Sequence, residues 1–123
     1  MIKTRKINRL SRELTEWLSN LKENSKIQVY YSDAKSGGGL SWLLEDIALK
    51  KDDDELIYII DFQGLKKLIG YILQLIREWL TKERPDDFIE YEITDKEVRI
   101  KGFAWIDDWQ WYFIDEYVIK VLD

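Results

Sequence analysis

The sequence predicts an α+β domain in which two or three helices pack on one mixed or antiparallel sheet of four to five strands. Two stretches with helical spacing, residues 10–21 and 65–82, are separated by short runs that alternate every second residue. A length of 123 residues with 46% hydrophobic content is typical of one domain, residues 1–123. Within it we predict a core unit of about residues 9–102 and an aromatic C-terminal extension, residues 103–123.

The first third of the chain is expected to form a short strand or tail, a helix and a strand. Residues 26–32 alternate between apolar and polar side chains, as in a strand. The Ser-Gly-Gly-Gly run at residues 36–39 is expected to be a flexible connection, since no phosphate-binding pattern accompanies its glycines. Five apolar residues at helical spacing predict an amphipathic helix of about twelve residues: Leu10, Leu14, Trp17, Leu18 and Leu21.

The middle of the chain contains one ambiguous segment, one strand and the longest helix. Residues 41–50 fit either a short helix or one strand of a hairpin that turns at residues 52–54. Residues 56–60 are mostly β-branched and uninterrupted, which is typical of a buried central strand, and Gln63-Gly64 is expected to end it. From Leu65 to about Lys82 the apolar positions cover more than half of a helix surface, so we expect this helix to be packed on two sides.

A hairpin is predicted after Pro85, which prevents the long helix from continuing. Residues 88–93 and 98–101 alternate on either side of the turn at residues 94–97. After Gly102 the chain is expected to form one or two further strands that end at Val121. Acidic and basic side chains face each other across the outer face of the predicted hairpin, which favours one register: Glu90, Glu92, Arg99 and Lys101.

The composition excludes several kinds of chemistry. The chain has no cysteine and no histidine, so disulfides, thiolate nucleophiles, imidazole metal ligands and His-based triads are absent. The acidic run at residues 52–55 lacks the pattern of a calcium loop and is better explained as a solvated turn. Pro85-Asp86 resembles the start of a nuclease motif, but the acid and lysine that should follow are missing. We therefore expect no enzymatic activity, no cofactor and no metal.

The charge distribution bears on partners and location. Residues 1–51 carry a net charge of +4 and residues 52–123 a net charge of −9, for a total of −5. An acidic domain repels phosphate backbones, so direct nucleic-acid binding is not expected. No signal peptide or membrane-spanning run is found, which predicts a cytoplasmic protein that does not bind membranes. The two halves can complement each other within one chain or between copies, which leaves a homodimer open.

Aromatic residues are concentrated near the C-terminus, where seven large rings occur in residues 103–117 together with several acids. If residues 109–114 form a strand, one face enters the core and the other leaves rings at the surface. Tryptophan and tyrosine are frequent anchors of protein interfaces. The alternative, that these rings only fill the core or the sheet edge, stays open. The candidate partner-binding residues are Trp105, Asp107, Asp108, Trp109, Trp111, Tyr112 and Asp115.

The order of elements resembles a known family. A helix with Leu14-x-x-Trp17-Leu18, a strand of the type Ile27-x-Val29, a long helix ending in Trp79-Leu80 and a final hairpin follow one another over about residues 9–102. In this the chain resembles the effector-associated constant component domains of bacterial conflict systems. The acidic residues 52–55 and the aromatic extension depart from that pattern. The resemblance implies an adaptor or regulatory role without catalysis, and it assigns no functional residues.

The leading hypothesis is a non-catalytic protein–protein interaction module, an adaptor or regulatory component in a prokaryotic or viral defence system, whose partner is another protein. The alternative is an acidic inhibitor that imitates nucleic acid, of the anti-restriction or anti-CRISPR type. A third hypothesis, a carboxylate-metal enzyme, requires three or more acids that converge in a pocket. The alternative inhibitor requires one contiguous acidic face that includes Asp86, Asp87, Glu90, Glu92, Asp107 and Asp108.

Overall fold

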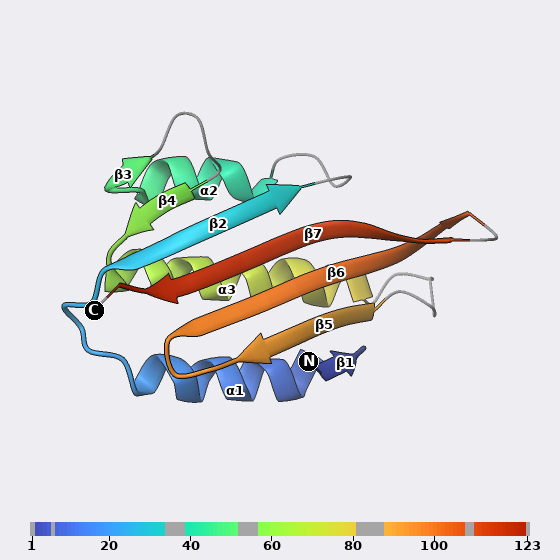
Figure 1. Ribbon diagram of the computed structural model, residues 1–123, viewed down its shortest axis with the longest axis horizontal. Helices are drawn as coiled ribbons and strands as arrows, with labels where there is room; N and C mark the ends of the chain where they lie inside the picture. The colour runs from blue at the N-terminus through green and yellow to red at the C-terminus, as the bar shows by residue number, and fades with distance from the viewer. Residues whose placement is uncertain are drawn as a thin grey trace.

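Seven antiparallel strands form one sheet and three helices lie on one of its faces in the part of the chain that the computed structural model describes (Figure 1). The sheet order is β1-β5-β6-β7-β2-β4-β3. The structure describes residues 2–5, 7–33, 39–51, 57–80, 88–107 and 110–122. The elements are β1 Ile2–Thr4, α1 Ile7–Ser19, β2 Ile27–Asp33, α2 Gly39–Ile47, β3 Lys50–Lys51, β4 Ile57–Ile60, α3 Phe62–Leu80, β5 Phe88–Ile93, β6 Glu97–Asp107 and β7 Gln110–Val121.

The predicted α+β class is confirmed, but the predicted four to five strands are too few for the described sheet. The additional strands are the two edges, β1 with three residues and β3 with two. Strands this short show no alternation in the sequence, because period two needs four or more residues to be seen. The ambiguous residues 41–50 contain both alternatives, since α2 ends at Ile47 and β3 then pairs with β4 as a short hairpin.

The core lies between the helices and the inner face of the sheet. Alternate residues of the central strands are fully buried, and registered neighbours such as Val29, Ile119 and Val98 form a continuous apolar row across β2, β7 and β6. Helix α1 contributes Leu10 and Leu14 to the same core. Each such side chain contributes about 1.5–3 kcal/mol when it is removed from water.

Helix α3 begins three residues earlier than the sequence predicted. The Asp61 carboxylate accepts a hydrogen bond from the Gly64 backbone N–H at 2.8 Å, and the Asp61 backbone carbonyl accepts one from the Leu65 N–H. Asp61 is therefore the N-cap, and Gln63-Gly64 lies in the first helical turn rather than at a strand end. A Cβ on Gly64 would lie 3.3 Å from the Asp61 Oδ1, which is a tight contact, and at ordinary van der Waals distances from the Cβ atoms of Ile60 and Ile47.

Both sides of α3 are packed, as predicted for its wide apolar surface. It contacts α1 and α2 and covers the sheet between them (Figure 1). Buried residues including Leu68, Ile69 and Ile72 face these neighbours. The exposed positions, among them Lys66 and Gly70, follow helical spacing on the remaining stripe.

Candidate protein-interaction site

Strands β6 and β7 continue past both of their neighbours. Strand β5 follows β6 as far as the pair Phe88–Phe103, and β2 follows β7 as far as the pair Asp33–Asp115. Among the described residues, 104–107 of β6 and 110–114 of β7 have no registered partner on β5 or β2. They form a two-stranded ribbon that extends beyond the sheet (Figure 1), which we call the arm.

The arm begins at an irregularity in the β6–β7 ladder. The register shifts between Gly102 and Phe103, and again between Trp105 and Asp107. Bulges of this kind bend a strand and increase its twist, and they are frequent where a strand leaves its sheet. Gly102, at this shift, is buried and is registered with Ile89 on β5 and Asp115 on β7.

The register brings aromatic positions together along the arm. Trp105 lies opposite Trp111, and Ala104 lies opposite Tyr112. Opposite residues of an antiparallel pair share a face, and successive residues alternate between the two faces. Four aromatic positions therefore fall on one face of the arm and its base: Phe103, Trp105, Trp111 and Phe113.

The seven predicted partner-binding residues are distributed between two strands and the segment that joins them. Asp108 and Trp109 lie outside the described residues. The other five are placed by their backbone only: Trp105 and Asp107 on β6, and Trp111, Tyr112 and Asp115 on β7. That their side chains anchor a partner stays a prediction, with filling of the core or the sheet edge as the alternative.

The base of the arm is fixed on both faces of the sheet. On the helix side, the rings of Tyr31 and Tyr117 stack with centroids 5.5 Å apart and planes 10° apart. On the open side, the Lys101 ammonium lies 3.5 Å from the Glu116 carboxylate, its registered neighbour on β7. A cross-strand pair of opposite charge contributes about 0.2–1 kcal/mol and favours this register.

The open face of the sheet carries mixed charge. Glu90 lies opposite Lys101 and Glu92 opposite Arg99, so the backbone register predicted for this hairpin is confirmed. The ion pairs that form are nevertheless with other acids. Arg99 bonds Glu97 on its own strand, which raises the pKa of its guanidinium, and Lys101 pairs with Glu116. Positive and negative side chains thus alternate over β5, β6 and β7.

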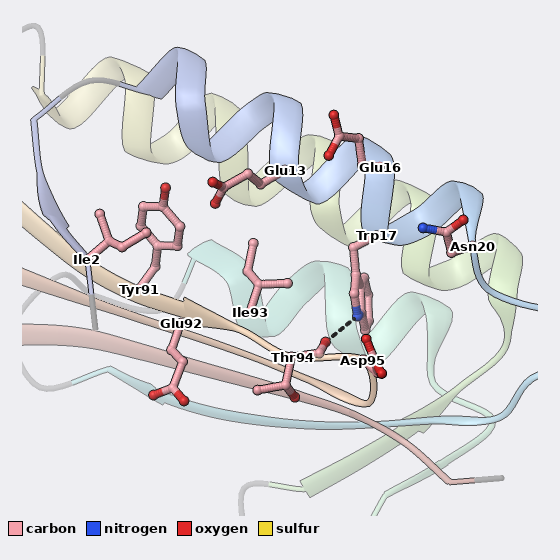
Figure 2. A pocket seen from close by; sticks show the side chains of 10 residues that line it. All are labelled: Ile2, Glu13, Glu16, Trp17, Asn20, Tyr91, Glu92, Ile93, Thr94 and Asp95. Carbon is pink, nitrogen blue, oxygen red and sulfur yellow. Dashed lines mark hydrogen bonds between the residues drawn. The ribbon is translucent and has the colours of Figure 1, made fainter.

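A second feature is a cleft of about 410 Å³ between α1 and the β5 edge of the sheet (Figure 2). Apolar side chains from both elements form its walls, and Ile93 points from β5 toward α1. Sequence analysis assigned Trp17 only to the apolar side of a helix and did not predict the cleft. Local patterns give no signal for it, because it depends on which strand α1 packs against. Four of its ten lining residues are acidic and none is basic: Glu13, Glu16, Glu92 and Asp95.

Trp17 closes one end of this cleft. Its indole N–H donates a hydrogen bond of 2.9 Å to the Thr94 carbonyl, which ties α1 to the turn between β5 and β6 (Figure 2). The Thr94 N–H in turn donates to the Glu97 carbonyl at 2.8 Å. The helix and the hairpin are therefore held together at a defined distance, and the cleft between them is part of the folded structure.

Tyr91 lines the other end of the cleft. It is completely buried, and its hydroxyl has no hydrogen-bond partner among the described residues although it points toward Glu13 on α1 (Figure 2). Burial raises the pKa of Tyr91, the nearby Glu13 carboxylate raises it further, and the charges of Arg9 and Arg12 lower it. Glu13 itself pairs with Arg9 at 3.1 Å. An unsatisfied polar atom in a buried position costs about 1–3 kcal/mol.

Two further observations complete the site. Within the described part of the chain, acidic side chains form no group of three that could hold a metal ion. No helix of that part is long and apolar enough to span a membrane.

Comparison of the chain with protein-family models, curated proteins and solved structures finds no match. The resemblance to the effector-associated constant component domains therefore stays a prediction.

Proposed function

We propose that this protein is a non-catalytic protein–protein interaction module that engages its partner through the arm. The observation that carries the proposal is the continuation of β6 and β7 past the sheet, with Trp105 and Trp111 at opposite positions. Following the family resemblance, the role is that of an adaptor or regulatory component in a prokaryotic or viral defence system.

The physical basis is that a ribbon of two strands gains little stability from itself. An isolated hairpin is marginally stable in water, and its outer edges present unpaired N–H and C=O groups. A protein partner can pair these edges and cover the aromatic face, and aromatic residues supply much of the affinity at such surfaces. Asp107 and Asp115, at the two ends of the arm, would favour a partner surface with basic groups.

The mixed charge of the open face favours this function over nucleic-acid mimicry. A mimic needs a contiguous acidic face, whereas Glu90 and Glu92 lie opposite Lys101 and Arg99. Asp86, Asp87 and Asp108 lie outside the described residues.

The experiment compares two variants in a pull-down from extracts of the native host. W105A/W111A removes the paired tryptophans of the arm. L49A/L122A is the matched control, because Leu49 and Leu122 are 61% and 47% exposed and lie away from the arm. We expect quantitative mass spectrometry to identify a protein that wild type and control retain and that W105A/W111A loses at least tenfold.

Circular dichroism and thermal unfolding must show that W105A/W111A is folded. Retention of the same proteins by folded W105A/W111A as by wild type would refute the proposal. Loss of the same protein from L49A/L122A would show general hydrophobic adhesion and would refute it as well.

A further inference from the structure

The outer edge of β5 is only partly covered. Strand β1 pairs with residues 89–91 of β5, and its last registered pair toward the turn is Ile2–Tyr91. Hydrogen bonding alternates along an antiparallel ladder, so successive residues direct their N–H and C=O groups to opposite sides. Because the Thr94 N–H bonds Glu97 on β6, the backbone groups of Ile93 point away from β6. Among the described residues, no strand pairs with Ile93 on that side.

This free edge opens into the cleft between α1 and β5. Ile93 lines the cleft with both its side chain and its strand, and Trp17 and Ile2 provide further apolar wall (Figure 2). The cleft therefore combines one unpaired backbone donor and acceptor with an apolar wall. A groove between a helix and a strand edge with these properties suits an extended peptide, which pairs with the edge and places alternate side chains in the groove.

The charge around the cleft selects the kind of peptide. Glu13 points toward Tyr91 inside the cleft, and Asp95 lies beside Trp17 (Figure 2). Glu16 projects from α1 at the upper rim, whereas Glu92 points to the open face of the sheet, where Arg99 is its registered neighbour. Arg9 on the preceding turn of α1 is paired with Glu13, and the charges of Arg9 and Arg12 act on Tyr91 in the cleft wall. Four of the residues that line the cleft are acidic and none is basic, which favours Lys and Arg side chains over acidic ones.

We infer that this cleft binds a short, extended, basic segment of a partner protein. The main chain of the segment pairs with the backbone N–H and C=O of Ile93, its apolar side chains contact Ile93 and Trp17, and its cations lie over the acidic rim. The Tyr91 hydroxyl is buried in the wall of this cleft and has no hydrogen-bond partner among the described residues. The site is separate from the arm, so it adds a second contact to the proposed function and does not depend on it.

The test uses the acetylated and amidated pentapeptide Lys-Val-Lys-Val-Lys with full-length protein labelled with ¹⁵N. We expect saturable chemical-shift changes at the Ile93 amide and the Trp17 indole N–H, and slower hydrogen exchange of the Ile93 amide by at least tenfold at saturation. The same peptide with N-methylated backbone at its centre keeps its charge and loses a backbone donor, so it should bind at least fivefold more weakly.

Two matched variants test the charge. E16Q/D95N removes two acids of the cleft, and E23Q/D46N removes two exposed acids elsewhere, so both change the net charge by the same amount. We expect about fivefold weaker binding to E16Q/D95N and less than twofold change for E23Q/D46N.

Three results would overturn the inference. These are equal binding of the N-methylated peptide, equal binding of Glu-Val-Glu-Val-Glu, and peptide-induced shifts that omit Ile93 and Trp17. Because the assay uses a defined peptide, its outcome is independent of whether the arm binds a host protein.

Discussion

The two ends of the β6–β7 pair have different surroundings, although the two strands pair with each other at both ends. At one end, residues 97–102 and 116–121, which we call the body, are flanked by β5 and β2 and covered by helices on one face. At the other end, the arm has β6 and β7 alone among the described residues. The change occurs at the first of the two register shifts, between Gly102 and Phe103.

This difference contrasts a packed part of the strand pair with a part that, among the described residues, has no flanking strand. The body places Ile100, Tyr117 and Ile119 in the core with 0–3% exposure, so its sequence is constrained by packing. Among the described residues the arm has no flanking strand, and the proposed function assigns its aromatic positions to contacts with a partner.

Ile119→Ala in the body should have the largest effect. Ile119 is fully buried, with Val29 opposite on β2 and Val98 opposite on β6. Removing its side chain creates a cavity in the centre of the sheet and should lower the free energy of unfolding by about 2–5 kcal/mol. Urea denaturation followed by circular dichroism measures this loss. A decrease below about 1 kcal/mol would mean that the body is not the structural centre of the fold.

Tyr91→Phe should have a smaller effect of opposite sign. The substitution keeps the buried ring and removes the hydroxyl that lacks a hydrogen-bond partner. The free energy of unfolding at pH 7 should therefore stay unchanged or rise by about 1 kcal/mol. Urea denaturation of both proteins at pH 7 measures the difference, and a loss above about 1 kcal/mol would show that the hydroxyl is bonded in the folded protein.

The same substitution has a predicted pH dependence. In the folded protein burial raises the pKa of Tyr91 above 10.0, whereas in the unfolded chain it titrates near its ordinary value of about 10. Below pH 10 the Tyr91 hydroxyl is protonated in both the folded and the unfolded state, so its titration does not lower the free energy of unfolding. Between pH 10 and the raised pKa only the unfolded state loses it, so wild type should lose stability over this interval relative to Tyr91→Phe. Denaturation at pH 8, 10 and 11 tests this, and parallel pH profiles would contradict it.

Much of the body could be predicted from the sequence, because apolar and polar side chains alternate along its strands. Alternation located β2, β5 and the inner part of β6, and opposite charges at Glu90 and Lys101 indicated the register that the structure has. The start of α3 was misplaced, since Gln63-Gly64 suits both a strand end and a first helical turn, and only the Asp61 cap decides between them.

The arm and the cleft could not be predicted, because both depend on which strands are neighbours. Alternation in residues 103–117 indicates strands but not where β5 and β2 stop pairing with them. Among the described residues, β1 pairs with β5 only as far as Tyr91, so no described strand lies beside Ile93. Sheet order joins segments far apart in the chain, as when β7 lies between β6 and β2, and no local pattern encodes it.

W105A/W111A should have the smallest effect on stability, and that small effect is the sharpest test of the comparison. The two residues lie opposite each other on a ribbon that, in the described structure, has no third strand. A cross-strand aromatic pair is worth about 0.2–1 kcal/mol relative to alanine, so the free energy of unfolding should fall by no more than about 1 kcal/mol. Urea denaturation beside Ile119→Ala measures both variants on one scale. If W105A/W111A instead lost about 3 kcal/mol or more, the tryptophans would belong to the core, and the arm would stabilise the domain rather than bind a partner.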